Sequence, residues 1–162
     1  MKFLLKIACC LAITVFQTAQ AGEQPMHDKG SQPVEVWVNP GFYSYHFERN
    51  KGFQDNNYGT GIQVTFSPTN SILAGGFRNS DNAYSRYAGW AWQPLELSAV
   101  KLGLAAGVID GYPRMRNGKP FLAVIPMASI EYKAIGANIT LIPRYKDKLH
   151  GAISIQVKLR IW

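Results

Sequence analysis

The sequence has few cysteines, few charged residues and little helical periodicity. Charged residues make up 17% of the 162 residues, while 47% are hydrophobic and 12% are aromatic. This composition excludes a disordered tail and a coiled coil. The length suits one domain, so a TIM barrel or a two-half dinucleotide-binding fold is excluded as well.

The N-terminal segment has the character of a secretory signal peptide. A lysine-containing start leads into an apolar run at 3–16, which ends in Thr18-Ala19-Gln20-Ala21. We expect cleavage after Ala21, because the run is too short for a membrane-spanning helix. A lipoprotein signal at Cys9 or Cys10 is the alternative, but these cysteines come early for one. Both would leave with the peptide, which excludes disulfides and thiol catalysis in the remaining chain.

After residue 21, residue types alternate with the period of two that is typical of β-strands. In the last segment one face is entirely apolar and carries Ile153, Ile155, Val157, Leu159 and Ile161. The opposite face is polar and carries Ser154, Gln156, Lys158 and Arg160. On this basis we predict eight strands, near 34–47, 58–66, 71–78, 86–93, 99–109, 120–132, 135–142 and 151–162.

The connections between these strands alternate in length. Short turns are expected at 67–70, 94–98 and 133–134, and longer polar loops at 48–57, 79–85, 110–119 and 143–150. An even number of antiparallel strands with short turns at one end and long loops at the other is typical of bacterial outer-membrane barrels. The sequence therefore predicts an all-β fold, an eight-stranded antiparallel transmembrane β-barrel over 34–162.

The alternative is a secreted soluble barrel or sandwich whose apolar faces point inward. Aromatic residues near the strand ends favour the membrane barrel, because they resemble interfacial girdles: Tyr43, Tyr45, Tyr58, Phe66, Phe77, Tyr87, Tyr132 and Trp162. Trp162 is the exception, since it falls on the polar phase of its strand.

Basic residues concentrate in or beside the long loops. Ten of them lie there: Arg49, Lys51, Arg78, Arg86, Arg114, Arg116, Lys119, Arg144, Lys146 and Lys148. In an outer membrane these loops would face the phosphates of lipopolysaccharide, although ordinary loop solubility explains any single residue equally well. We expect no nucleic-acid partner, because no recognition module is present. We also expect a monomer with no metal and no other cofactor.

Three stretches resemble the lipid A palmitoyltransferases of Gram-negative outer membranes, the PagP family. They are Ala88-Gly89-Trp90 with Gln93-Pro94-Leu95, Leu102-Gly103-Leu104 with Ala106-Gly107-Val108, and Pro120 to Tyr132 with its core Ile125-Pro126-Met127-Ala128-Ser129. The last continues into Thr140-Leu141-Ile142-Pro143. The resemblance implies an outer-membrane barrel that transfers an acyl chain from a phospholipid to lipid A.

Two prolines, Pro126 and Pro143, fall in successive predicted strands. A proline inside a strand cannot donate a ladder hydrogen bond, so we expect the barrel wall to open on both sides of one strand. The resemblance implies that such gaps are lateral doors for lipid acyl chains. The alternative is a pair of bulges that only bend the wall.

The residues facing the lumen of the upper barrel suit an acyl-chain slot. Gly103, Ala105 and Gly107 would leave volume, and Phe121, Ala123, Ile125 and Met127 would line it, although core packing explains them nearly as well. The resemblance implies that Ala91 occupies the position of a small residue, glycine in the best-known members, that limits pocket depth. A shallower pocket and a shorter acyl chain would follow. The predicted substrate-binding residues are Ala91, Gly103, Gly107, Pro126, Met127 and Pro143.

The resemblance also implies catalytic residues. The family has a histidine at the top of the first strand and an adjacent Asp-Ser pair in a later loop, which match His46, Asn79 and Ser80. A histidine can remove a hydroxyl proton near neutral pH, but Asn79 lacks the charge of the family Asp. We hypothesise that Asp81 or Glu48 supplies it. His27 and His150 have no comparable support.

The N-terminal part of the remaining chain also departs from the family. Family members begin with an amphipathic helix, whereas 22–33 is short, polar and contains Pro25 and Pro33, so no helix is expected there. Together with Asn79, this departure leaves a second hypothesis open: a noncatalytic outer-membrane barrel with a lipid-binding, structural or interaction role.

Overall fold

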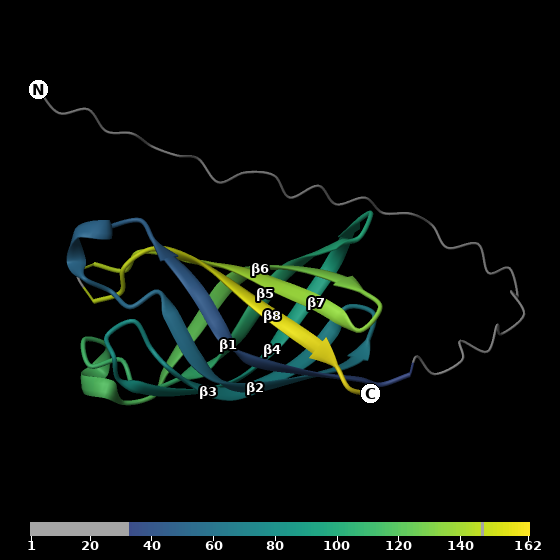
Figure 1. The fold of residues 1–162 in the computed structure, drawn as a ribbon, viewed down its shortest axis with the longest axis horizontal. Coiled ribbons are helices and arrows are strands. Elements are labelled where there is room, and N and C mark those ends of the chain that lie inside the picture. Colours follow the sequence, from purple (N-terminus) through teal and green to yellow (C-terminus); the bar gives the residue numbers. More distant parts are fainter. Residues whose placement is uncertain (1–32, 147) are drawn as a thin grey trace, which may run out of the picture. The chain divides into compact units, whose positions relative to one another are not determined.

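The computed structural model describes residues 33–162 except 147, so the predicted signal peptide and almost all of 22–33 lie outside the described part. Eight strands follow one another around a closed barrel: β1 (Glu35–His46), β2 (Asn56–Ser67), β3 (Asn70–Arg78), β4 (Tyr84–Leu97), β5 (Val100–Ile109), β6 (Phe121–Tyr132), β7 (Ile135–Ile142) and β8 (Ala152–Arg160). Each strand pairs antiparallel with the next, and β8 closes onto β1 (Figure 1). The predicted eight-stranded antiparallel barrel is confirmed. No helix in the described ranges is long and apolar enough to cross a membrane.

The two ends of the barrel differ as the sequence predicts. Two-residue turns at 68–69, 98–99 and 133–134 lie at the end that holds the C-terminus (Figure 1). The long loops lie at the other end, with two short 3-10 turns, η1 (Arg49–Lys51) and η2 (Arg116–Gly118). We use "loop end" and "turn end" for these two ends.

The turn predicted at 94–98 comes later than expected, because the chain turns at 98–99 and not at Pro94. β4 runs on to Leu97, and Pro94 lies inside it at a register shift, where Trp92 pairs with Leu104 and Leu95 pairs with Leu102. A bulge of this kind tolerates a residue without an N–H, which is why a proline can stand within the strand.

Apolar residues point outward and polar residues point into the lumen. On β8 the side chains of Ile153, Ile155, Val157 and Leu159 are 38–53% exposed, whereas Ser154 and Lys158 are buried. The alternative in which these apolar faces point inward is therefore wrong. Most of the predicted girdle residues are exposed, but Phe77 and Tyr87 line the lumen instead. They were mistaken for exterior residues because the lumen near the loop end is itself apolar.

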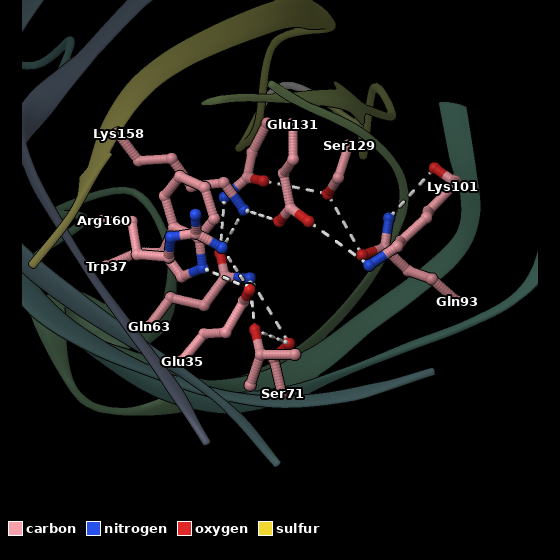
Figure 2. A network of polar contacts seen from close by, with 12 residues as sticks. Glu35, Trp37, Gln63, Ser71, Gln93, Lys101, Ser129, Glu131, Lys158 and Arg160 are labelled. Atoms are coloured by element: carbon pink, nitrogen blue, oxygen red, sulfur yellow. Dashed lines mark hydrogen bonds and ion pairs between the residues drawn. The ribbon is translucent and has the colours of Figure 1, made fainter. Parts of the chain in front are cut away.

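The turn-end half of the lumen is filled by a polar network to which all eight strands contribute (Figure 2). Lys158, only 1% exposed, donates to Glu131 Oε1 at 2.6 Å and to Gln63 Oε1 at 3.1 Å. Lys101 donates to the other oxygen of Glu131 at 3.2 Å. Amide and hydroxyl groups continue the network through Gln93, Ser129, Asn138, Gln63 and Ser71. Within the described residues no buried side-chain polar atom lacks a hydrogen-bond partner.

Candidate functional site

An apolar cavity of about 190 Å³ occupies the loop-end half of the lumen. Its lining is mostly aromatic and aliphatic: Phe42, Leu73, Phe77, Tyr87, Phe121, Ala123, Ile125 and Met127. Asn138 and Gln156 also line it, and because Asn138 belongs to the polar network, that network borders the cavity on the turn-end side. A hydrocarbon chain could lie along these walls, whereas a charged group would lose its hydration there.

Only some of the predicted substrate-binding residues line this cavity. Gly107 and Met127 line it, whereas Ala91, Gly103, Pro126 and Pro143 do not. Ala91 is buried in the lumen between cavity-lining Gly89 and the network residue Gln93, so it stands at the cavity's inner boundary.

Gly103 was predicted to leave volume for an acyl chain, but it does not line the cavity. A Cβ atom at this position would lie 1.9 Å from the carbonyl oxygen of Trp92 and 2.6 Å from Cα of Gln93. The glycine therefore allows β5 to approach β4 closely beside the bulge at Pro94. Its role is to permit close packing of the two backbones, and it does not enlarge the cavity.

The barrel wall is interrupted between β6 and β7. Their ladder begins at the pair Met127–Thr140 and runs only toward the turn end. From Phe121 to Pro126, β6 pairs with β5 alone. On the other side of β7, pairing with β8 is continuous from Ile135 to Ile142. The expected opening on both sides of one strand is thus wrong for the β8 side, because Pro143 lies just beyond the end of the ladder.

A second irregularity, which the sequence reasoning missed, lies in β1. The β1–β8 ladder has no pairs between Val38 and Tyr43, and the β1–β2 register shifts between Asn39 and Gly41. Gly41 has φ of 103°, a conformation that favours glycine, and it follows Pro40. The Pro-Gly dipeptide was the available signal for this irregularity.

His46 is the last residue of β1 and is nearly buried. It lies four residues beyond cavity-lining Phe42, on the same inward-facing side of the strand. Its Nδ1 is 3.2 Å from Oδ1 of Asp55, whose other oxygen accepts a hydrogen bond of 2.8 Å from Arg49. Because the carboxylate can only accept, Nδ1 carries a proton, and in the neutral imidazole Nε2 keeps its lone pair. The arrangement is that of a histidine base held by a carboxylate.

Asp55 is therefore the carboxylate partner, in place of the expected Asp81 or Glu48. Burial alone would raise its pKa, but hydrogen bonds from Arg49 and His46 outweigh that effect and hold the pKa below its usual value. Asp55 was missed because it is nine residues from His46 and becomes its neighbour only when β2 pairs with β1.

Ser80 lies close to the same side of β1. Its hydroxyl oxygen is 3.5 Å from that of Ser44 and 3.4 Å from Oδ1 of Asn57. Asn57 donates to Ser44 at 2.8 Å. The structure thus brings Ser80 into contact with Ser44, which lies two residues before His46 on β1. The described contacts include no direct hydrogen bond between Ser80 and His46.

Asn79 is fully buried, and its amide joins its own loop to β4 and to the loop between β5 and β6. Its Nδ2 donates to Ser85 Oγ and to the carbonyl oxygen of Gly111, both at 2.9 Å. Its Oδ1 accepts from the backbone N–H groups of Asp81 and Ala83. A carboxylate has no N–H to donate, so the bond to Gly111 requires asparagine.

A second histidine, which the sequence reasoning set aside, joins the site. His150 Nδ1 is 2.5 Å from Oε2 of Glu48, and its Nε2 is 3.1 Å from Nη1 of Arg114. The hydrogen bond from His150 and the charge of Arg144 hold the pKa of Glu48 below its usual value, although desolvation opposes them. Phe53 contacts both imidazoles, with ring centroids 4.8 Å from His46 and 4.6 Å from His150.

The chain is similar to the lipid A acyltransferase PagP of Laribacter hongkongensis (strain HLHK9). The two are 27% identical over 119 residues, which cover 68% of this chain and 56% of that protein. The predicted resemblance is confirmed. The chain spans little more than half the length of the curated relative it matches. No family model matches the chain.

The described residues contain no group of three or more His, Cys, Asp and Glu side chains that could hold a metal ion.

Proposed function

We propose that the protein is an outer-membrane enzyme that transfers an acyl chain from a glycerophospholipid to lipid A. The observation that carries the proposal is the position of His46, which is paired with Asp55 and ends the strand that also lines the apolar cavity through Phe42. A base beside an acyl-chain cavity is what acyl transfer between two lipids requires. The similarity to a lipid A acyltransferase supports the same choice of reaction.

The exterior of the barrel supports a location in the membrane. The outward faces of the strands are apolar, and a closed barrel leaves no unpaired sheet edge in hydrocarbon. The basic loops would face lipopolysaccharide, whose phosphates suit Arg and Lys. We therefore assign the protein to the outer membrane of a Gram-negative bacterium.

The interrupted wall supports lateral entry of the donor lipid. Along Phe121–Pro126 the ladder between β6 and β7 is absent, and the inward residues of that stretch line the cavity. An acyl chain entering from the bilayer there would meet apolar walls at once. Ala91, at the inner boundary of the cavity, would limit the length of the chain that fits.

In the proposed reaction, His46 acts as the general base. Its Nε2 removes the proton from an acceptor hydroxyl on lipid A as that oxygen attacks the ester carbonyl of the phospholipid. The new acyl–oxygen bond forms on lipid A, and the bond to the glycerol oxygen breaks. The imidazolium then gives its proton to the glycerol oxygen, which leaves as a lysophospholipid. Asp55 stabilises the imidazolium between these two transfers.

A noncatalytic lipid-binding barrel is the second candidate, and Asn79 favours it. The side-chain amide of Asn79, which matches the family Asp, donates to Ser85 and Gly111, and its described hydrogen bonds do not include His46. If Asp55 does not replace that carboxylate in function, the cavity could still hold an acyl chain without transferring it.

Mass spectrometry of lipid A tests the enzyme. A Gram-negative host that lacks such an acyltransferase would express the wild-type chain, His46→Ala, Asp55→Asn or the exposed loop variant Lys119→Ala. We expect one added acyl chain with the wild type and Lys119→Ala, none with His46→Ala and little with Asp55→Asn. Unmodified lipid A from cells whose outer membrane contains the folded wild-type barrel would contradict the enzyme and leave the lipid-binding barrel.

A further inference from the structure

Three rings meet at the loop end of the barrel. Phe53, in the loop between η1 and β2, contacts His46 of β1 and His150 of the β7–β8 loop, with its ring plane tilted 32° from the first and 44° from the second. The guanidinium of Arg114, from the loop between β5 and β6, lies 5.8 Å from the centre of the Phe53 ring. Residues from three loops and one strand end thus meet at Phe53.

The contacts of His150 define its hydrogen-bonding form. Arg114 can only donate, so Nε2 of His150 accepts at 3.1 Å and carries no proton. Nδ1 therefore carries the proton and donates to Glu48 at 2.5 Å. Both nitrogens are occupied by protein partners, which leaves His150 unsuited to exchange protons with a substrate.

The partners of His150 are held in turn by other charges. Glu48 also pairs with Arg144 at 3.0 Å, and Arg114 lies 3.8 Å from Asp81 in the loop that holds Ser80. The His150 side chain is 9% exposed, so its ring has little freedom to move. These contacts make His150 a fixed support for Phe53.

We infer that His150 is a positioning residue for His46, acting through Phe53. His150 fixes the plane of the Phe53 ring, and that ring restricts the rotation of the His46 imidazole about its bond to Asp55. One hydrogen bond alone leaves an imidazole free to tilt, whereas a hydrogen bond and a ring contact together define its orientation. The expected fall in kcat rests on the proposed acyl transfer, but the expected change in the orientation of the His46 ring does not.

The test uses four variants of the full barrel refolded in detergent micelles. His150→Ala removes the support, and Phe53→Leu removes the intervening ring. Phe53→Tyr keeps an aromatic ring in place, and Tyr145→Phe changes an exposed residue of the same loop as His150. Two readouts are taken from each: the ¹⁵N and ¹H NMR signals of the histidine rings, and kcat and KM for acyl transfer from a phosphatidylethanolamine to purified lipid A.

We expect the His46 ring signals to move in His150→Ala and Phe53→Leu and to stay in place in Phe53→Tyr and Tyr145→Phe. In the first two, kcat should fall by roughly tenfold or more while KM changes by less than about twofold, because a misplaced base slows the reaction without weakening lipid binding. In the wild type, the NMR signals should identify His150 with its proton on Nδ1.

Unchanged His46 signals in folded His150→Ala or Phe53→Leu would overturn the inference. If His150→Ala does not fold, Phe53→Leu against Phe53→Tyr decides the question. If the wild type transfers no acyl chain, the proposed function fails, while the NMR comparison still decides whether His150 positions His46.

Discussion

At the scale of single residues, the ion pair between Asp55 and Arg49 predicts a pH dependence of the loop end. The folded-state pKa of Asp55 is below its ordinary value of 3.8, so ionised Asp55 favours the folded loop. This stabilisation is fully present above pH 3.8 and is lost as the pH falls through the lower, folded-state pKa. We expect Asp55→Asn to lack that acid-dependent loss.

Hydrogen exchange of the backbone amides in 47–55, measured between neutral and strongly acid pH, checks this expectation. The wild type should lose protection in acid, whereas Asp55→Asn should already be less protected at neutral pH and change little. Asp81→Asn serves as the control, because Asp81 does not contact His46 or Arg49. Equal acid responses in the wild type and Asp55→Asn would show that another group titrates there.

At the scale of the strand, Gly103 controls how closely β4 and β5 pack beside Pro94. Gly103→Ala should destabilise the barrel by about 1–3 kcal/mol, because its Cβ would meet backbone atoms that cannot move aside as a side chain could. Ala106→Val adds volume to the outward face of the same strand and should cost much less. The urea midpoints of the two refolded barrels give the comparison, and similar midpoints would contradict the close approach.

The elements themselves could be predicted from the sequence, because alternation with a period of two survives wherever one face is apolar and the other polar. It holds throughout β8, where the predicted faces are confirmed. It weakens near the loop end, where the cavity makes both faces apolar, and there Phe77 and Tyr87 were placed on the wrong side. Pro94 was mistaken for a turn because a bulge and a turn share the same local signal.

The candidate site was harder to predict than the strands. His46 and Ser80 came from the resemblance, whereas Asp55, Phe53 and His150 lie in loops whose mutual contacts depend on closure of the barrel. No local pattern in the sequence indicates that the loop before β2 and the loop before β8 meet at one phenylalanine. Asn79 shows the same limit, since its partner Gly111 is 32 residues away.

At the scale of the whole molecule, the barrel combines an apolar exterior with a polar turn-end interior, in which the charged side chains pair with one another. Lys158 and Glu131 lie at the centre of that interior, and Lys101 and Gln63 complete their contacts (Figure 2). Because the network joins strands that are not neighbours in the barrel, such as β2 and β7, it resists flattening of the turn-end half. Removing one charge from this network should therefore lower the free energy of unfolding of the whole barrel.

We expect Lys158→Met to lower the free energy of unfolding by about 3–5 kcal/mol, the usual cost of leaving a buried partner charge uncompensated. The double change Lys158→Met with Glu131→Leu should recover much of this loss, because it removes the stranded carboxylate as well. Lys133→Met, in an exposed turn, is the matched control and should have little effect. Urea unfolding of the barrels refolded into lipid vesicles measures all three. A Lys158→Met barrel as stable as the control would mean that Lys101 alone compensates Glu131, and that the lumen network does not hold the strands together.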